Sequence, residues 1–194
     1  KSKIVLGGHS IGGSLSIMAS KHLNDKVNGL VLADPVVINY YYKYFTKFFG
    51  PLGYDSNTVK LYRQALKKRS KWKSFDEVLK SYTNRGIFKT WKEGFLYDYL
   101  IGGTKKDENG VHLSCNPETE AASFINTEKI TTPNIVKNIN VPTLLLIAEF
   151  GSTTASISSF KKLKHLKQVE RIRGGSHFFP MEQPDKLISF IKGF

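Results

Sequence analysis

The chain has 194 residues, a mass of 21.9 kDa and a net charge of +13. Its apolar content of 40% fits a folded globular protein and excludes a disordered or fibrous one. The sequence holds no run of about 18 apolar residues, the length that a membrane-spanning helix needs.

The positive charge raises the question of a nucleic-acid partner. The lysines are spread over polar helix faces, as in LYRQALKKRSKWKS and FKKLKHLKQ, and no nucleic-acid-binding motif accompanies them. We therefore expect no nucleic-acid binding. Weak attraction to an acidic membrane surface or an acidic protein partner agrees better with the charge.

The cysteine and the histidines of the sequence bear on disulfides, on the cellular compartment and on metal binding. The single cysteine, Cys115, permits no internal disulfide, which fits a reducing, intracellular compartment. The C-terminal KGF is not a peroxisomal Ser-Lys-Leu signal, so peroxisome, mitochondrion and cytoplasm all stay open. The histidines lack the spacing of metal ligands, and we expect neither a metal nor a cofactor.

The first predicted strand, residues 4–6, leads into GHSIG at residues 8–12, which matches the pattern G-x-S-x-G. We expect a sharp strand-to-helix turn around Ser10, so tight that a Cβ on either flanking glycine would clash. IGGSLSIMASKHL then predicts a helix. Its N-terminus, with the backbone N–H of Ile11, would stabilise negative charge on a substrate oxygen.

A serine nucleophile needs a histidine base and a carboxylate, in the chain order serine, acid, histidine. The acid that we favour is Asp34, at the end of the second predicted strand, residues 30–33. A carboxylate there would lie beside the Ser10 turn, although Asp34 would also suit a turn without catalysis. The alternative acid is Glu149, which directly follows the third predicted strand, residues 143–148.

The histidine that we favour is His177, in RGGSHFFPMEQPD, after a fourth and weaker strand over residues 169–172. We expect the side chain of His9 to point away from this base position. A basic helix capped by Ser152 or Thr153 should precede the fourth strand, and QPDKLISFIKGF predicts a closing helix.

Residues 39–127 form a long segment that is rich in aromatic residues and has helical patterns. We expect this segment to be a lid inserted between the core segments 1–38 and 128–194. SFDE at residues 74–77 matches a capping box, and Gly86 is the expected stop of that helix. NPETEAASFI predicts a second lid helix, with its asparagine as N-cap.

The lid begins with NYYYKYFTKFFGPLGY, a segment rich in aromatic side chains. In a helix, Tyr41, Phe45 and Phe48 would lie on one side, and with Phe178 they would line a pocket for an apolar acyl group. The same rings would also serve as the lid's own core.

With Ser10, Asp34 and His177 in that order, the sequence resembles the α/β-hydrolase superfamily. The stretches GGHSIGG, VNGLVLADPVVI and VERIRGGSHFFPMEQPD are similar to a fungal branch that includes a yeast peroxisomal lipase and hydrolases of toxin biosynthesis. The resemblance implies an α/β fold with parallel strands from the serine turn onward and a helical lid. It also favours Asp34, because this branch tends to lack the later aspartate.

In the superfamily the serine turn follows the fifth strand, so the resemblance covers only the C-terminal part of that fold. It implies that a missing N-terminal half, or another chain, covers the edge of the first strand and supplies a second oxyanion donor. The expected function is hydrolysis of apolar acyl esters, and an acyltransferase would use the same residues. The alternative is a catalytically silent structural or interaction subunit of a larger assembly.

Overall fold

The computed structural model describes residues 3–39, 44, 57–155 and 157–194. These fall into two compact units, the first formed by Lys1–Tyr54 with Thr127–Phe194 and the second by Asp55–Asn126. Among the described helices, none combines the length and the apolar character that a membrane span requires.

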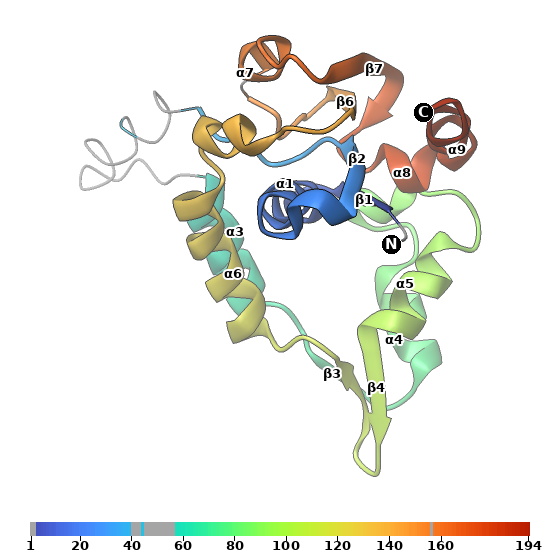
Figure 1. The fold of residues 1–194 in the computed structure, drawn as a ribbon. Coiled ribbons are helices and arrows are strands. Elements are labelled where there is room, and N and C mark those ends of the chain that lie inside the picture. The colour runs from blue at the N-terminus through green and yellow to red at the C-terminus, as the bar shows by residue number, and fades with distance from the viewer. Residues whose placement is uncertain (1–2, 40–43, 45–56, 156) are drawn as a thin grey trace. The chain divides into compact units, whose positions relative to one another are not determined.

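The first unit is built on a parallel sheet in the order β1-β2-β6-β7 (Figure 1). Its strands are β1 (Ile4–His9), β2 (Val27–Ala33), β6 (Thr143–Phe150) and β7 (Leu166–Ser176). The four strands predicted from the sequence are confirmed, and each is longer than expected, β7 most of all. Parallel strands end on the same side, so the residues that follow β1, β2 and β7 come together at one edge of the sheet.

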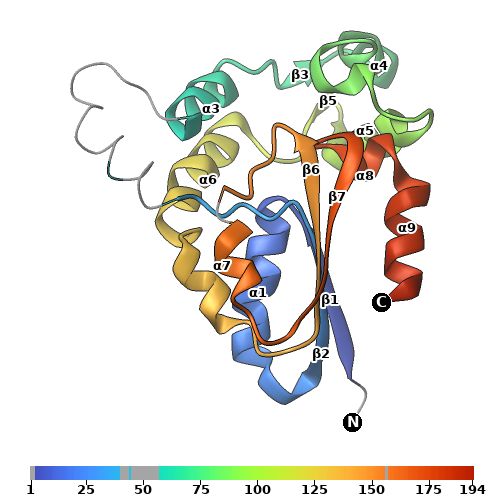
Figure 2. The same cartoon turned by 90° about the horizontal axis from the view of Figure 1, so that it is seen from above.

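Helices cover both faces of this sheet (Figure 2). Helix α1 (Ile11–Leu23), helix α7 (Ile157–Lys161) and the 3-10 turn η4 (Pro133–Asn138) pack on one face. Helices α8 (Phe179–Glu182) and α9 (Pro184–Gly193) pack on the other. A short 3-10 turn, η1 (Asn24–Lys26), links α1 to β2.

The two central strands are apolar on both sides because both faces are covered. In β2, Leu30 and Leu32 pack with α1 and α7, whereas Val31 and Ala33 pack with α8. The side chains of β6 alternate in the same way between the two clusters. Burying one such side chain contributes about 1.5 to 3 kcal/mol, so these two strands hold the sheet edge that carries the site in a fixed position.

Strand β1 is an outer strand of this sheet and pairs with β2. Ile4 and Val5 are 42% and 53% exposed. Exposed apolar side chains on an outer strand of a parallel sheet are unusual, because such sheets are normally covered.

The second unit combines helices with a small antiparallel sheet in the order β3-β5-β4. Its elements are α3 (Asn57–Leu66), β3 (Lys71–Trp72), α4 (Phe75–Tyr82), η3 (Gly86–Lys89), α5 (Phe95–Gly103), β4 (Thr104–Asp107), β5 (Gly110–Leu113) and the start of α6 (Pro117–Ile130). These helices, including the start of α6, lie within residues 39–127, whose role as a lid stays a prediction, and the small sheet was not predicted.

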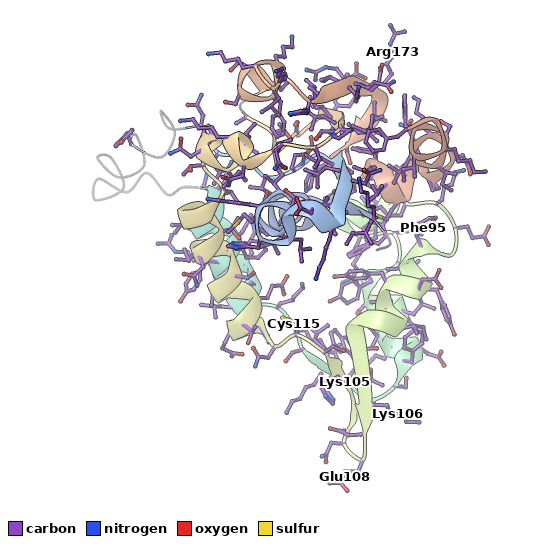
Figure 3. The ribbon with its side chains drawn as sticks, in the orientation of Figure 1. Phe95, Lys105, Lys106, Glu108, Cys115 and Arg173 are labelled. Carbon is purple, nitrogen blue, oxygen red and sulfur yellow. The ribbon has the colours of Figure 1, made fainter. Side chains whose placement is uncertain are left out.

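The β4–β5 hairpin had a signal in the sequence. It turns at Glu108-Asn109, and Gly110 follows with φ +123°. A Cβ at Gly110 would lie 2.3 Å from the carbonyl oxygen of Trp72 on β3, so only glycine fits. Asn109 and Gly110 are residue types typical of tight turns, although the two residues between the strands are Glu108 and Asn109. Figure 3 labels Lys105, Lys106 and Glu108, exposed charged residues around this turn.

Two predicted helix starts are confirmed in this unit. The side chain of Ser74 accepts a hydrogen bond from the N–H of Glu77, and Asn116 does the same for Thr119. The Glu77 carboxylate accepts from the N–H of Lys73. The predicted stop at Gly86 is wrong: α4 ends at Tyr82, because Thr83 returns its N–H to Leu79.

Candidate active site

Ser10 stands between β1 and α1 with φ 57°, a left-handed conformation that side chains rarely adopt. Two backbone hydrogen bonds to the end of β2 and the residues after it hold Ser10 in this conformation. The Ser10 N–H donates to the carbonyl of Ala33 (3.0 Å), and the Ser10 carbonyl accepts from the N–H of Val36 (3.2 Å). The predicted strand-to-helix turn is therefore present and rigidly connected to the end of β2.

The glycines around Ser10 have unequal roles. A Cβ at Gly8 would lie 2.3 Å from the backbone of Gly12, so position 8 admits only glycine. A Cβ at Gly13 would meet Pro35 at 3.0 Å. At Gly12 a Cβ would meet nothing within 4 Å. The expectation that a Cβ would clash at both flanking glycines is thus wrong for Gly12. The backbone of Gly12 is what a Cβ at Gly8 would clash with, but Gly12 itself has room for a Cβ.

Asp34 follows β2 and has a left-handed conformation of its own, with φ 45°. Its side chain is fully buried. The carboxylate accepts hydrogen bonds from the hydroxyl of Ser152 (2.6 Å) and from the N–H groups of Thr153 (2.9 Å) and Ala148 (3.1 Å). Burial acts to raise the pKa of Asp34, but the hydrogen bonds from His177, Ser152 and the backbone outweigh it and hold the pKa below its ordinary value.

His177 lies in the loop between β7 and α8 and contacts both other residues. Its Nδ1 is 2.6 Å from Oδ2 of Asp34, and its Nε2 is 2.9 Å from Oγ of Ser10. A carboxylate only accepts hydrogen bonds, so Nδ1 carries the proton. Nε2 of the neutral ring then has its lone pair toward the serine hydroxyl.

The loop that carries His177 is braced by its own side chains. The carboxylate of Glu182 accepts from both the N–H (2.9 Å) and the hydroxyl (2.7 Å) of Ser176. The Ser176 oxygen in turn accepts from the N–H of Phe178 (3.0 Å). These bonds define the shape of the loop on both sides of His177.

Glu149, the alternative acid, lies elsewhere. It is exposed at the end of β6, where its carboxylate accepts from the N–H of Gly174 (2.7 Å). The structure brings Asp34, and not Glu149, into contact with the His177 ring. Glu149 instead ties β6 to β7.

The basic helix that was expected to begin at Ser152 or Thr153 is not formed there. Helix α7 begins at Ile157, and both residues instead form a loop that turns back onto Asp34. The hydroxyl of Thr153 donates to the Asp34 carbonyl (2.9 Å). The capping side chains thus satisfy a buried carboxylate rather than a helix end.

Taken as chemistry, the arrangement can accept a proton from the Ser10 hydroxyl and stabilise the resulting cation. The charge on His177 would be balanced by Asp34, whose own ionised form is favoured by its neighbours. Ile11 is the first residue of α1, so its backbone N–H lacks a partner within the helix, and its role as an oxyanion donor stays a prediction.

Comparison with protein-family models gave no match, and comparison with curated proteins gave none either. Solved structures do match. An E-2-(acetamidomethylene)succinate hydrolase superposes with a TM-score of 0.77 at 15% identity, covering 100% of this chain and 67% of that one. The peroxisomal alpha-beta-hydrolase from Saccharomyces cerevisiae gives 0.75 at 19% identity, covering 97% of this chain and 51% of that one.

The chain has an α/β-hydrolase fold. An esterase from the thermophile Thermogutta terrifontis is also similar, with a TM-score of 0.56, 19% identity, and coverage of 99% of this chain and 64% of that one. The chain therefore spans about half to two thirds of the length of these α/β-hydrolase structures. At these identities the likeness concerns the fold, and its assignment to a fungal branch stays a prediction.

Within this α/β-hydrolase fold, the prediction for His9 is wrong. Its ring lies against the His177 ring, with centroids 4.7 Å apart, and its Nε2 is 2.7 Å from the backbone oxygen of His177. Burial lowers the pKa of His9, and the hydrogen bond to the His177 carbonyl opposes that only in part. Adjacent side chains of a strand point to opposite faces, so the side chain of His9 was expected on the face opposite to that of Ser10. Ser10, however, has a left-handed backbone conformation, to which this alternation does not apply.

The expected pocket residues have different outcomes. Phe178 is half-buried, and its ring centroid lies 5.1 Å from that of His177. Tyr41, Phe45 and Phe48 lie outside the described residues, so their part in a pocket stays a prediction. Tyr44, from the same segment, is 58% exposed.

Proposed function

We propose that this chain hydrolyses carboxylic esters, with Ser10 as nucleophile, His177 as general base and then acid, and Asp34 as the carboxylate that orients His177. The observation that carries the proposal is the position of the His177 ring. Its Nε2 is 2.9 Å from the Ser10 oxygen, and its Nδ1 is 2.6 Å from the Asp34 carboxylate. A serine hydroxyl is a weak nucleophile until such a base activates it.

In the first half of the reaction, Ser10 Oγ attacks the ester carbonyl carbon while its proton moves to Nε2 of His177. The tetrahedral oxyanion is stabilised by the N–H of Ile11 at the start of α1. When the intermediate collapses, the bond to the alcohol oxygen breaks and His177 returns its proton to that oxygen. The products are the free alcohol and an acyl group bound to Ser10.

In the second half, water replaces the alcohol. His177 removes a proton from the water as it attacks the acyl carbon, and the bond to Ser10 breaks as the proton passes to Oγ. The carboxylic acid leaves and the resting site is restored. Asp34 stays ionised throughout, because its several donors favour the charged form, and it stabilises the His177 cation in both halves.

We further propose that the acyl group is apolar. Phe178 offers an aromatic surface directly beside His177, and the segment NYYYKYFTKFFGPLGY is rich in the same kind of side chain. The names of similar structures, which include esterases and a thioesterase domain, agree with acyl chemistry of this general class. With p-nitrophenyl esters of rising chain length, kcat/KM should increase from acetate toward octanoate, and Phe178→Ala should flatten that rise.

Covalent labelling tests the proposal directly. A fluorophosphonate probe should modify the wild-type chain, and Ser10→Ala should lose both labelling and ester turnover. Ser189→Ala is the matched control, because its hydroxyl donates only to its own helix, at the Lys186 carbonyl. A folded wild-type chain that neither labels nor turns over esters would overturn the proposal and favour a silent interaction subunit. Acyl transfer to an added alcohol in place of water would indicate an acyltransferase.

A further inference from the structure

His9 connects the two halves of the candidate site. It directly precedes Ser10 in the chain, and its ring nitrogen Nε2 lies 2.7 Å from the backbone carbonyl oxygen of His177. A carbonyl oxygen only accepts hydrogen bonds, so His9 Nε2 must carry a proton and donate it. The neutral His9 ring is therefore the Nε2–H tautomer, and it donates to the backbone of His177.

The bond made by His9 differs from the others that shape the loop. The bonds among Ser176, Phe178 and Glu182 lie within the loop and α8, and fix its internal conformation. The His9 bond instead runs from the loop to His9, the last residue of β1, which directly precedes Ser10. It therefore fixes the distance between β1 and the His177 loop. The contact between Ser10 and His177 depends on that distance.

The His9 ring also supports the His177 ring by contact. Their centroids are 4.7 Å apart with an angle of 37° between the planes, and the Phe178 ring lies 5.1 Å from His177 at 74°. The imidazole of His177 is thus held at Nδ1 by Asp34 and has aromatic neighbours beside it.

We propose that His9 is a positioning residue for His177. The Nε2–H of His9, bonded to the His177 carbonyl, holds the loop between β7 and α8 at the distance from β1 at which the His177 ring contacts the Ser10 hydroxyl. This inference rests on the proposed function. Because displacement of reacting groups by about 1 Å can cost about 100-fold in rate, loss of this one bond should be visible in catalysis.

The hydrogen bond and the ring contact can be separated by substitution. His9→Phe keeps an aromatic ring and loses the donor. His9→Gln loses the ring, but its side-chain amide nitrogen can occupy the place of Nε2 and donate. If the bond positions His177, His9→Phe should lower kcat by about 10- to 100-fold with KM changed less than about threefold, and His9→Gln should recover most of the loss. His22→Phe, an exposed histidine on α1, is the matched control and should behave as wild type.

A spectroscopic measurement makes the test independent of turnover. In the wild-type chain, the Nδ1 proton of His177, bonded to Asp34, should give a downfield proton resonance in the 15N-histidine-labelled protein. It should broaden or disappear in His9→Phe and persist in His9→Gln. If His9→Phe does not fold by circular dichroism, His9→Asn, whose amide is too short to reach the carbonyl, takes its place.

The outcomes separate this inference from the proposed function. Wild-type kcat in His9→Phe, or equal losses in the Phe and Gln variants, would overturn the positioning role while leaving ester hydrolysis intact. A change in KM alone would make His9 a substrate contact and would also overturn it. A wild-type chain without activity or labelling would defeat the proposed function, and the resonance of His177 would still decide whether His9 holds that ring in place.

Discussion

Ser152 donates its hydroxyl proton to the buried carboxylate of Asp34 across 2.6 Å. The two residues come from different strand ends, since Asp34 follows β2 and Ser152 lies in the loop after β6. Together with the N–H groups of Thr153 and Ala148, Ser152 lets a fully buried aspartate keep its charge. The loop after β6 thus contributes donors to the site, and the carboxylate comes from the strand beside it.

Replacing Ser152 by alanine should destabilise the fold and weaken the site. A hydrogen bond to a buried charged group contributes about 1.5 to 3 kcal/mol, and its loss should appear as a lower free energy of unfolding in urea. Ser189→Ala, which removes an exposed hydroxyl on α9, should stay within about 0.5 kcal/mol of wild type. Equal stability of the two variants would mean that Asp34 does not need this donor.

Acid should unfold the Ser152→Ala variant at a higher pH than wild type. The pKa of Asp34 is lower in the folded chain than its ordinary value, so its contribution to stability is present above about pH 4 and is lost as the pH falls through the folded pKa. Without Ser152 the folded pKa rises and this contribution shrinks. Acid titration followed by far-ultraviolet circular dichroism would measure it, and coincident curves for the two proteins would contradict it.

The two acidic candidates can be distinguished by isosteric amides. Asp34→Asn should lower kcat by about 1,000- to 10,000-fold, because an amide can no longer stabilise the protonated histidine or fix its tautomer. Glu149→Gln should leave kcat within about threefold of wild type, because that carboxylate contacts Gly174 and not His177. Steady-state ester kinetics on folded protein would decide, and the reverse ranking would assign the role to Glu149.

Alanine substitutions at the serine turn should differ in effect. Gly8→Ala places a Cβ 2.3 Å from the Gly12 backbone, and should cost about 3 kcal/mol or more, or prevent folding. Gly12→Ala meets no atom within 4 Å and lies in the first turn of α1, so its stability should stay within about 1 kcal/mol of wild type. Thermal unfolding of the pair would measure this, and equal melting temperatures would contradict it.

The outer edge of β1 gives a prediction about association. We propose that a further strand, from another segment or chain, pairs with this edge, since Ile4 and Val5 are exposed on an outer strand. The chain studied alone should then self-associate through it, and Val5→Lys should reduce the association seen by sedimentation velocity. Ile188→Lys, which changes an exposed apolar residue on α9, should have a smaller effect. Equal effects of the two substitutions would indicate non-specific hydrophobic association instead.

Much of the fold was predictable because the signals were local. A continuous apolar run indicated β2 and β6, and the pattern G-x-S-x-G indicated the turn at Ser10. His177 was predicted from the chain order serine, acid, histidine and from its place between the last predicted strand and the last predicted helix. For these two strands and for the turn, a few adjacent residues determine the local backbone, so the sequence carries the information in one place.

The remaining features depend on contacts between distant segments. Nothing in GSTTAS indicates that Ser152 and Thr153 donate to Asp34, and that competition removed the helix cap expected there. The position of the His9 ring follows from the turn at Ser10 together with the approach of the His177 loop. The small sheet was missed although Asn109-Gly110 signalled its hairpin, because the surrounding helical pattern outweighed two short strands.

The hydrogen bond between His177 and Ser10 joins residues 167 positions apart, and that between His177 and Asp34 joins residues 143 apart. Closing such long loops is entropically costly until the intervening strands have docked, so we expect these contacts to form late in folding. A reagent that modifies only an activated serine would therefore count the molecules that have completed folding, and its time course after dilution from denaturant would follow the last stage of refolding.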